Sequence, residues 1–480
     1  MSMKDQALLF PDLASRQVVA DFTGGRLSSD GGTLLLRMID RGLGVSRMLA
    51  GCFTDTRDQK YVDHAVEELV AQRLHALALG YEDLNDHNSL RLDPLLAVSV
   101  GKEDPLGLDR VRPQHQGVAL AGASTLNRME LSNARSGGAH KLKHDPEAVR
   151  DCVLKLGVRC LDRSAKELVL DLDAMGHLVH GTQEGRHFIT YYDGYVYLPL
   201  YILVGDVVLW ADLRRADEGA ATGALPAVQR VVAAIRRRIP GVRILLRGDG
   251  GFCRDELMAW CEAQSEVHFV LGLPQNPVLV RALDKAFVDA QMRWCLSGVA
   301  TREYVKFQHE TVTGTWTRPR TVIGKAELTP EGRNPRFIVT NLPADRFPED
   351  AAPDRFAPAN LYEEIYCARG NCENILKQQV LDLHADRMSS HYFAANQLRL
   401  WFATLAYLIL QRMRAVGLVG TGLEKATAGT IRNRLLKIAA IVKVSVRRVY
   451  IQLCTACPVQ AIYRLCHQRL FETDWSLCRT

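Results

Sequence analysis

The sequence predicts a mixed α/β protein in which a sheet core is interrupted by a β-rich insertion and flanked by helical regions at both ends. Three patterns predict this fold class. Apolar residues have helical spacing before residue 135, short apolar strands alternate with helices from about residue 150, and short strands separated by Gly, Pro and Thr follow residue 295. Of the 480 residues, 47% are hydrophobic and 24% are charged, which excludes a disordered chain and a small disulfide scaffold.

The N-terminal region, residues 1–145, is predicted to be helical and to end in a linker. Val62–Leu79 carries apolar residues at helical spacing and stops at Gly80. Ser28–Asp30 offers N-caps for the helix that follows it. Residues 136–145 are polar and contain glycine, which is typical of a linker.

The first part of the core, residues 146–275, is predicted from the order of its elements. Three strands in succession are followed by a helix, a strand, a helix and a strand, which is a mixed α/β layout. The predicted segments are strands at 168–174, 194–203 and 206–213, a helix at 225–238, a strand at 242–246, a helix at 255–262 and a strand at 267–271.

Three further regions complete the predicted organisation. Residues 276–358 form the β-rich insertion, with strands at 304–307, 320–323 and 337–340. Residues 359–415 return to the core, and residues 416–480 form a basic C-terminal region. Helices are predicted from Leu361 to the C-terminus, with a break around 417–422.

Charge is distributed unevenly along the chain. Residues 387–480 contain 14 Lys and Arg against three acids, a net charge of +11. Because the whole chain carries +6, residues 1–386 carry −5. A basic C-terminal part on a mildly acidic body favours a surface for a polyanion, although a solvated basic helical face has the same composition.

Nothing in the sequence predicts secretion or a membrane span, so we expect a cytosolic protein. The longest apolar stretch, Leu400–Leu410, has about half the length that a bilayer requires, and we expect a buried helix there. The twelve cysteines follow no framework and are expected to be reduced. Cys454 and Cys457, followed by Cys466 and His467, have the side chains of a zinc site. They lie in a run predicted to be helical, whereas a tight Cys-x-x-Cys site needs a turn, so zinc is disfavoured.

Three acidic positions are the candidates for chemistry. Alternation along the strand at 168–174 places Asp171 and Asp173 on one face. Asp249 follows the strand at 242–246, between glycines that allow close approach of a ligand or another backbone. Taken singly, the two aspartates of the first strand also suit a solvent-facing strand end, and Asp249 also suits a plain turn.

The third acid, Glu373, lies on a predicted helix face with Tyr366, Arg369 and Lys377, which are spaced by three and four residues. That face alone would suit a surface ladder of ion pairs. Together with the two aspartates, Glu373 completes an oxygen-ligand set for two Mg²⁺ ions, for which Mn²⁺ can substitute. Such ions activate an attacking oxygen and stabilise a leaving oxygen in phosphoryl transfer. Arg369 and Lys377 would meet phosphate, and Tyr366 would stack on a sugar or base.

The chain resembles the DDE transposases of bacterial insertion sequences, specifically the insertion-sequence family numbered thirteen-eighty. The motifs that carry the resemblance are Leu170–Met175, His180–Gly185, Tyr195–Tyr201, Arg247–Phe252 and Tyr366-x-x-Arg369-x-x-x-Glu373, with Leu27–Gly32 and the basic C-terminal region in addition. Two positions depart from the family pattern. Met175 stands where the family usually has Thr. Val380 stands where a related signature has Lys, and Lys377 would take the place of that lysine.

The resemblance implies a ribonuclease-H-like core in which Asp173, Asp249 and Glu373 are the catalytic and metal-binding acids, with Asp171 as the runner-up for the first. It implies metal-dependent cleavage at terminal inverted repeats, strand transfer into double-stranded target DNA, and a homodimer in the synaptic complex near the bacterial nucleoid. The N-terminal and C-terminal regions would hold the DNA, and Trp294 or Trp316 of the insertion would stack on a flipped nucleotide. The alternatives are a ribonuclease-H-like nuclease without strand transfer and an inactive DNA-binding regulator.

Overall fold

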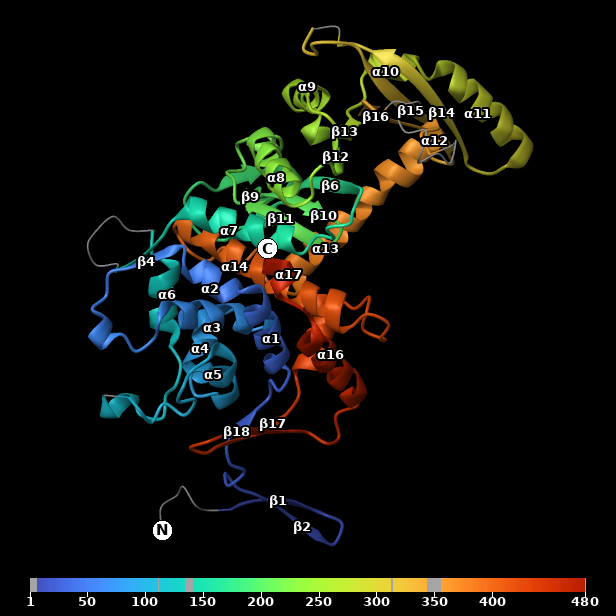
Figure 1. Cartoon of the computed structure of the whole chain (residues 1–480). Helices are drawn as coiled ribbons and strands as arrows, with labels where there is room; N and C mark the ends of the chain where they lie inside the picture. The colour runs from blue at the N-terminus through green and yellow to red at the C-terminus, as the bar shows by residue number, and fades with distance from the viewer. Residues whose placement is uncertain (1–6, 111, 134–140, 312–313, 343–354, 480) are drawn as a thin grey trace. The chain divides into compact units, whose positions relative to one another are not determined.

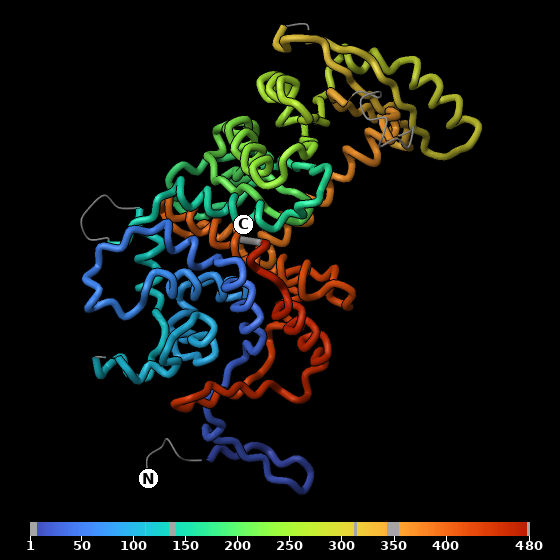
Figure 2. Tube along the Cα trace, in the orientation of Figure 1, coloured from blue at the N-terminus to red at the C-terminus, as the bar shows by residue number. Residues whose placement is uncertain are grey.

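The computed structural model describes residues 7–110, 112–133, 141–311, 314–342 and 355–479. The chain forms two compact units, which Figures 1 and 2 trace from the N-terminus to the C-terminus. Unit 1 comprises residues 1–144 and 409–476, and unit 2 comprises residues 145–408 and 477–480. The division falls inside helix α14 (Phe393–Arg412), so one helix contributes to both units.

Unit 2 is built on an eight-stranded mixed sheet of order β11-β10-β6-β12-β13-β16-β15-β14, which confirms the predicted mixed α/β class. β12 runs parallel to both β6 and β13, and the other neighbouring pairs are antiparallel. The strands are β6 (Glu167–Ala174), β10 (Leu200–Val204), β11 (Val207–Asp212), β12 (Arg243–Gly248), β13 (Val267–Leu273), β14 (Thr301–His309), β15 (Arg320–Thr329) and β16 (Gly332–Thr340).

The strand predicted at 194–203 is two strands in the structure. Pro199 has no backbone N–H to donate to a ladder, and the chain changes sheet around it. The residues before it pair in a small three-stranded sheet, and those after it join the large sheet as β10. The small sheet consists of β7 (His177–Leu178), β8 (His187–Ile189) and β9 (Gly194–Tyr197).

The strands predicted for the insertion are present, are longer than expected, and extend the large sheet. β16 pairs with β13 from Phe337 to Thr340, and β15 and β14 continue outward from it. Helix α11 (Asp284–Ser297) packs on β14 and β15. The shorter helix α10 (Pro277–Arg281) precedes it and is capped by Asn276, whose side chain accepts a hydrogen bond from the N–H of Leu279.

Helices cover the large sheet, with α7 on β11, α8 on α7 and β11, and α9 on β13. α7 begins where Asp145 accepts hydrogen bonds from the N–H groups of Glu147 and Ala148. α8 ends with Arg236–Arg238, whose positive charges suit a helix C-terminus. The helices of unit 2 that precede α14 are α7 (Pro146–Arg159), α8 (Ala224–Arg238), α9 (Asp255–Ala263), α10, α11, α12 (Pro358–Asn360) and α13 (Gly370–Leu381).

The helical segment Phe393–Gly417 is long and apolar enough to cross a membrane by length and composition. In its most apolar window, 83% of the residues are buried inside the protein. The predicted apolar stretch Leu400–Leu410 is buried throughout. This confirms the expectation of a buried core helix.

Unit 1 is mainly helical. α3 is buried from Leu69 to Leu79 and ends at Gly80, whose φ of +88° is a left-handed conformation that favours glycine. The predicted caps at Ser28–Asp30 are wrong, because Asp30 instead accepts hydrogen bonds from Tyr81 and Lys437. The helices are α1 (Thr33–Leu43), α2 (Val45–Ala50), α3 (Val66–Leu79), α4 (His87–Leu90), α5 (Pro94–Val100), α6 (Ala123–Glu130), α15 (Ala428–Ile431) and α16 (Gln460–Glu472).

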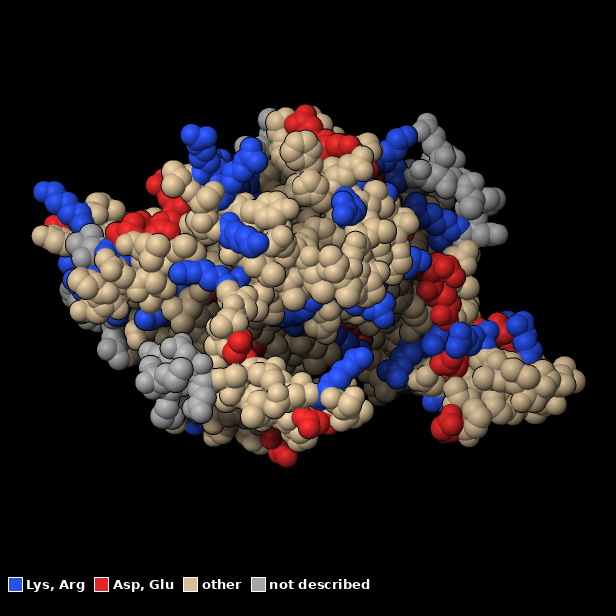
Figure 3. Space-filling view, turned by 90° about the horizontal axis from the view of Figure 1, so that it is seen from below, with Lys and Arg blue, Asp and Glu red and all other residues tan. Residues whose placement is uncertain are grey.

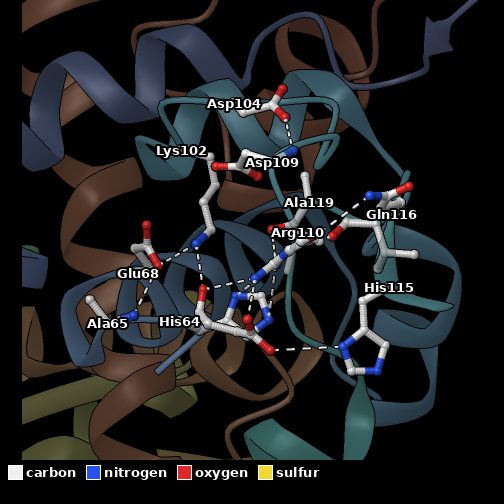
Figure 4. A network of polar contacts seen from close by, with 12 residues as sticks. His64, Ala65, Glu68, Lys102, Asp104, Asp109, Arg110, His115, Gln116 and Ala119 are labelled. Atoms are coloured by element: carbon white, nitrogen blue, oxygen red, sulfur yellow. Dashed lines mark hydrogen bonds and ion pairs between the residues drawn. The ribbon is translucent and has the colours of Figure 1, made fainter. Parts of the chain in front are cut away.

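Polar contacts fix the chain around residues 101–119 to the beginning of α3, as Figure 4 shows. Lys102 donates to a Glu68 carboxylate oxygen at 2.6 Å and to the carbonyl oxygen of Asp63 at 3.0 Å. Arg110 donates to the same Asp63 carbonyl at 3.0 Å. Burial, together with the nearby Lys102 and Arg110 cations, lowers the pKa of His64 to about 3, so this histidine is neutral at physiological pH.

Two segments predicted as helical are β-hairpins. The first pairs β1 (Leu8–Leu13) with β2 (Arg16–Ala20), and the second pairs β17 (Ala440–Val444) with β18 (Val449–Leu453). In β17 buried and exposed positions alternate. Ala440 and Val442 are buried, whereas Ile441 and Lys443 are exposed. That two-residue period favours a strand over a helix. β17 also pairs with β3 (Leu27–Ser28).

The remaining pair of strands in unit 1 lies next to the predicted linker. β4 (Phe53–Asp55) pairs with β5 (Leu142–His144). Residues 136–140 of the predicted linker at 136–145 lie outside the described residues. The last residues of this segment are not a simple linker, because Leu142–His144 form β5 and Asp145 is the N-cap of α7.

Candidate active site

Asp171 and Asp173 both lie on β6, two residues apart, but their surroundings differ. Asp171 is 3% exposed, and the guanidinium of Arg247 donates two hydrogen bonds to its carboxylate. Asp173 lies at the open end of the strand and is only partly buried. Asp171 is therefore engaged in a buried ion pair, and Asp173 is the carboxylate of β6 that is open to a ligand.

Arg247 also connects the sheet to the helical segment that follows α12. Its Nη1 donates to the backbone carbonyl oxygen of Ile365 at 2.7 Å. Arg247 and Asp171 are register partners across the parallel strands β12 and β6. One buried side chain thus joins two strands of the sheet to the helix that carries the third predicted acid.

Asp249 follows β12 directly, at the same edge of the sheet as Asp173. β6 and β12 are parallel, with Gly248 opposite Leu172, so the residues that follow them emerge side by side. Asp249 caps the short turn η6 (Gly250–Phe252), where its Oδ1 accepts a hydrogen bond from the N–H of Gly251 at 2.9 Å. This hydrogen bond restrains the carboxylate and leaves its second oxygen available.

Glu373 lies on the helix predicted for it, but that helix is irregular. η8 (Leu361–Tyr366) is a π-helical turn, η9 (Cys367–Arg369) is a 3₁₀ turn, and only then does α13 begin. π-helical turns are rare and are frequent at functional sites. Leu361 and Tyr362 are buried against the sheet in a hydrophobic cluster with Val270 and Ile338, which anchors the start of the segment.

Arg369 lies between the predicted acids. Its Nη1 is 3.5 Å from Asp173 Oδ2, and its Nη2 is 3.3 Å from Glu373 Oε1. We call Asp173, Asp249 and Glu373 the acidic trio. Burial alone would lower the pKa of Arg369, but the negative charge of the acidic trio, with Tyr366, outweighs burial and raises it.

The acidic trio shares one electrostatic environment. The pKa of Asp173 is raised, first by burial and then by the negative charges of Asp249 and Glu373, while Arg369 acts in the opposite direction. The structure therefore brings together all three predicted acids with Arg369, although they come from positions 76 and 124 residues apart in the chain.

Tyr366 joins this group through a glycine that sequence reasoning missed. A Cβ atom added to Gly272 would lie 2.6 Å from the Tyr366 hydroxyl and 2.8 Å from the backbone nitrogen of Gly250. Glycine at this position of β13 therefore lets the tyrosine and the end of β12 approach each other. An isolated glycine inside a strand was the signal that could have found it. Burial raises the pKa of Tyr366.

The other predicted DNA contacts lie apart from these interactions. Lys377 is exposed on α13, and among the described residues its side chain has no ion-pair partner. Trp294 is a half-buried residue of α11. Trp316 packs edge-on against His309, with ring centroids 5.6 Å apart, and lies under the guanidinium of Arg320.

The acidic trio fits a divalent cation by its chemistry. Carboxylate oxygens are the ligands of Mg²⁺, and a cation would offset both the burial and the nearby acids that raise the pKa of Asp173. Among the described residues, no three His, Cys, Asp or Glu side chains are arranged to share a metal ion as they stand. The cation that bridges Asp173 and Glu373 in the structure is the guanidinium of Arg369.

The cysteines of the C-terminal region form no metal site among the described residues either. Cys454 and Cys457 follow β18 in a turn rather than in the predicted helix, which begins at Gln460. The described part of the chain contains no cluster of metal-ligating side chains around them. The eleven cysteines whose side chains the structure describes are free thiols, as the composition predicts.

Comparison with known proteins identifies one family. Residues 10–475 match the family described as transposase DDE domain group 1. A solved structure of a piggyBac transposase synaptic complex with hairpin DNA is similar at a TM-score of 0.34 and 11% identity, over 89% of this chain and 91% of that chain. A TM-score this low does not establish a common fold. No curated protein sequence matches the chain.

Proposed function

The chain belongs to the transposase DDE domain group 1 family, and from this we propose that it cleaves DNA at the ends of its own insertion sequence and joins those ends to target DNA. The observation that carries the proposal is the acidic trio around Arg369 at one edge of the sheet. DDE transposases generally depend on divalent metal. Asp173, Asp249 and Glu373 are the residues that would hold it.

When bound, two Mg²⁺ or Mn²⁺ ions would supply the charge that activates an attacking oxygen and stabilises the leaving oxygen. The chain's own residues do the positioning. Arg369 presents a planar guanidinium, which binds phosphate oxygens through two parallel hydrogen bonds. DNA phosphate would compete with Asp173 and Glu373 for it. Arg247 holds the helical segment of Arg369 against the sheet through the carbonyl of Ile365.

Tyr366 lies at the edge of a cavity of about 250 Å³. The cavity is also lined by Gly250, which follows Asp249, by the exposed Arg336 and by the buried rings of Phe337 and Tyr362. A tyrosine ring next to a catalytic carboxylate can stack on a sugar or base of the cleaved strand. Trp294 and Trp316 are further proposed stacking residues, and Trp316 packs against His309 and Arg320.

The finer assignments are also proposals. The sequence motifs favour the insertion-sequence family numbered thirteen-eighty, and the order β6, β10, β11, β12, β13 with antiparallel and parallel pairs favours a ribonuclease-H-like core. Transposition joins two ends, so we propose a homodimer in the synaptic complex. Unit 1 contains both the N-terminal helices and the basic C-terminal region, and we propose that it binds the duplex in the bacterial cytosol.

The test uses DNA fragments that carry the two genomic flanks of the coding sequence. We expect Mg²⁺-dependent cleavage at the element ends by the wild-type chain, and a loss of at least a thousandfold for Asp249→Asn with retained end binding. Glu256→Gln, an exposed acid of α9 in the same unit, is the matched control and should cleave normally. Cleavage by Asp249→Asn at the wild-type rate, or cleavage in excess chelator, would overturn the assignment.

Two alternatives give different products in the same assay. A nuclease without strand transfer would cleave the ends but yield no joined product from a pre-cut end and a target plasmid. An inactive DNA-binding regulator would bind the ends and cleave neither substrate. The acidic trio argues against the regulator, because three carboxylates close to phosphate weaken binding unless divalent cations neutralise them, as the catalytic reaction requires.

A further inference from the structure

The hairpin of β17 and β18 has one covered face and one exposed face. Ala440, Val442 and Ile451 pack inward against Leu95 in a hydrophobic cluster of unit 1. The opposite face carries Lys443, which is the register partner of Tyr450, a residue that is 61% exposed. Figure 1 shows this hairpin at a margin of unit 1. Its outward face is therefore free to meet a partner, and that face is cationic and aromatic.

Hydrogen bonds between Ser445 and Arg448 close the tip of the hairpin, although its sequence is not a turn former. Ser445 donates its N–H and its hydroxyl to the carbonyl oxygen of Arg448, at 2.9 Å and 3.0 Å, and Ser445 Oγ accepts the N–H of Arg448 at 3.2 Å. Two-residue hairpin turns favour Asn and Gly, whereas Val446 and Arg447 stand here. These contacts preorganise the tip, and its two central side chains point to a role other than turn formation.

The tip presents charge without a partner. Val446 has 105% relative exposure, and Arg447 and Arg448 are exposed. Within the described ranges, neither arginine side chain has a hydrogen bond or an ion pair. The sequence contains no acid between Glu424 and Glu472. In Figure 3, acidic side chains gather mostly toward the margins of the face shown, while Lys and Arg stand over its middle.

A groove lies beside the hairpin, between β18 and the first turns of α16. Its volume is about 630 Å³. Ile438, Ile451 and Leu453 form its apolar wall, and its polar and aromatic side chains are Tyr450, Gln452, Gln460, Tyr463, Arg464 and His467. Arginine and amide side chains bind phosphate and sugar oxygens and base edges, and an exposed aromatic ring packs on sugar or base. The lining contains no carboxylate, so the groove suits an anionic chain better than a basic peptide.

We propose that the β17–β18 hairpin is a DNA-binding element whose tip places Arg447 and Arg448 in the minor groove of the duplex, while the adjacent groove holds the neighbouring phosphates. A narrow, A·T-rich minor groove has an enhanced negative potential that attracts arginine, and an apolar residue beside the arginines can rest on the groove wall. The proposal rests on the proposed function, because it assigns a DNA contact to a transposase.

The experiment measures binding of the full-length chain to labelled duplexes carrying the element's flanks, in a series of salt concentrations. We expect Arg447→Ala with Arg448→Ala to lower affinity at least tenfold, and to reduce the slope of log K against log salt by about 2, at about 0.9 for each lost phosphate-neutralising cation. Arg163→Ala with Arg237→Ala is the matched control. It removes two exposed arginines of unit 2 that have no ion pair with any residue that the structure describes, and it should bind as the wild type does.

A second variant tests the groove that the arginines enter. Arg447→Lys with Arg448→Lys keeps both charges, so it should retain the salt slope but lose the preference for A·T-rich over G·C-rich duplexes. A tip variant that folds and binds both duplexes as the wild type does would overturn the proposal, and an unchanged A·T preference in the lysine variant would overturn the minor-groove placement. Wild-type binding without cleavage would overturn the proposed function and leave the hairpin assignment standing.

Discussion

The guanidinium of Arg247 forms two parallel hydrogen bonds with the carboxylate of Asp171, at 2.7 Å and 2.8 Å, across neighbouring parallel strands. Arg247 is 8% exposed and Asp171 is 3% exposed. The same arginine reaches the backbone of the helical segment that carries Arg369 and Glu373. The pair therefore supports the acidic trio from inside the sheet.

Replacing only one partner of this ion pair should lower the free energy of unfolding more than replacing both partners. Arg247→Met leaves the buried Asp171 carboxylate unpaired, and we expect a loss of about 3–5 kcal/mol in the free energy of unfolding. Arg247→Met combined with Asp171→Leu should recover most of that loss, yet it should still cleave slowly because the contact with Ile365 is gone. Urea unfolding of the three proteins checks this. Equal losses in the single and double variants would contradict the coupling.

Asp173→Asn should separate stability from activity. The raised pKa of Asp173 means that its charged form is disfavoured in the folded protein, so its contribution to stability is present below the ordinary value of 3.8 and is lost as pH rises through the raised pKa. The neutral amide avoids that loss. At neutral pH we therefore expect unfolding free energy equal to or above that of the wild type, with cleavage abolished.

The pH dependence provides the control for this prediction. The stability advantage of Asp173→Asn should shrink on acidification and vanish near pH 3, where the wild-type carboxyl is also neutral. Unfolding free energies at neutral and acidic pH measure it. An advantage for the wild type at neutral pH would show that the ion pair with Arg369 outweighs burial.

Gly272→Ala should impair cleavage without removing any functional group. The new methyl would meet the Tyr366 hydroxyl at 2.6 Å and the backbone of Gly250, which follows Asp249. We expect a loss of tenfold or more in cleavage rate. Tyr366→Phe removes the hydroxyl and should recover part of the activity in the double variant. Cleavage rates of the four proteins form the test, and full activity of Gly272→Ala would contradict the close approach.

Gly370→Ala is expected to stabilise the protein. Gly370 begins α13, has ordinary helical dihedral angles and is exposed, and a Cβ there would meet nothing within 4 Å. Alanine at a helical position gains roughly 0.5–1 kcal/mol over glycine. If DNA approaches this turn next to Arg369, the variant should also bind element ends more weakly. Thermal unfolding and end binding measure the two effects, and a destabilised variant would contradict the open surroundings.

Local sequence patterns predicted most elements of unit 2, because strands such as β10, β12 and β13 have a continuous apolar run and a clear boundary. They also predicted that Asp249 would follow a strand end, since the carboxyl end of an apolar strand is visible in the sequence. Patterns failed for β17, whose residues are all apolar except Lys443, so that its two-residue alternation of buried and exposed positions is visible only once it pairs with β18 and β3.

Local patterns could not choose between Asp171 and Asp173, and only the family resemblance favoured Asp173. Both lie on one face of β6, and only a tertiary contact, the approach of Arg247 from β12, distinguishes them. The same holds for Gly272, whose importance depends on how close Tyr366 comes from a helix 94 residues later. Contacts of this kind are set by packing and leave no local periodicity.

The pairing of β16 with β13 has a consequence for synthesis of the chain on the ribosome. β13 is complete at Leu273, but its second neighbour is not translated until residue 340. During that interval the unpaired backbone N–H and C=O groups of this apolar strand are open to other nascent chains, and an open edge of this kind is a site for aggregation. Chains whose synthesis stops between these positions would accumulate as insoluble fragments. The length of the intervening segment sets how long each new molecule needs protection by chaperones.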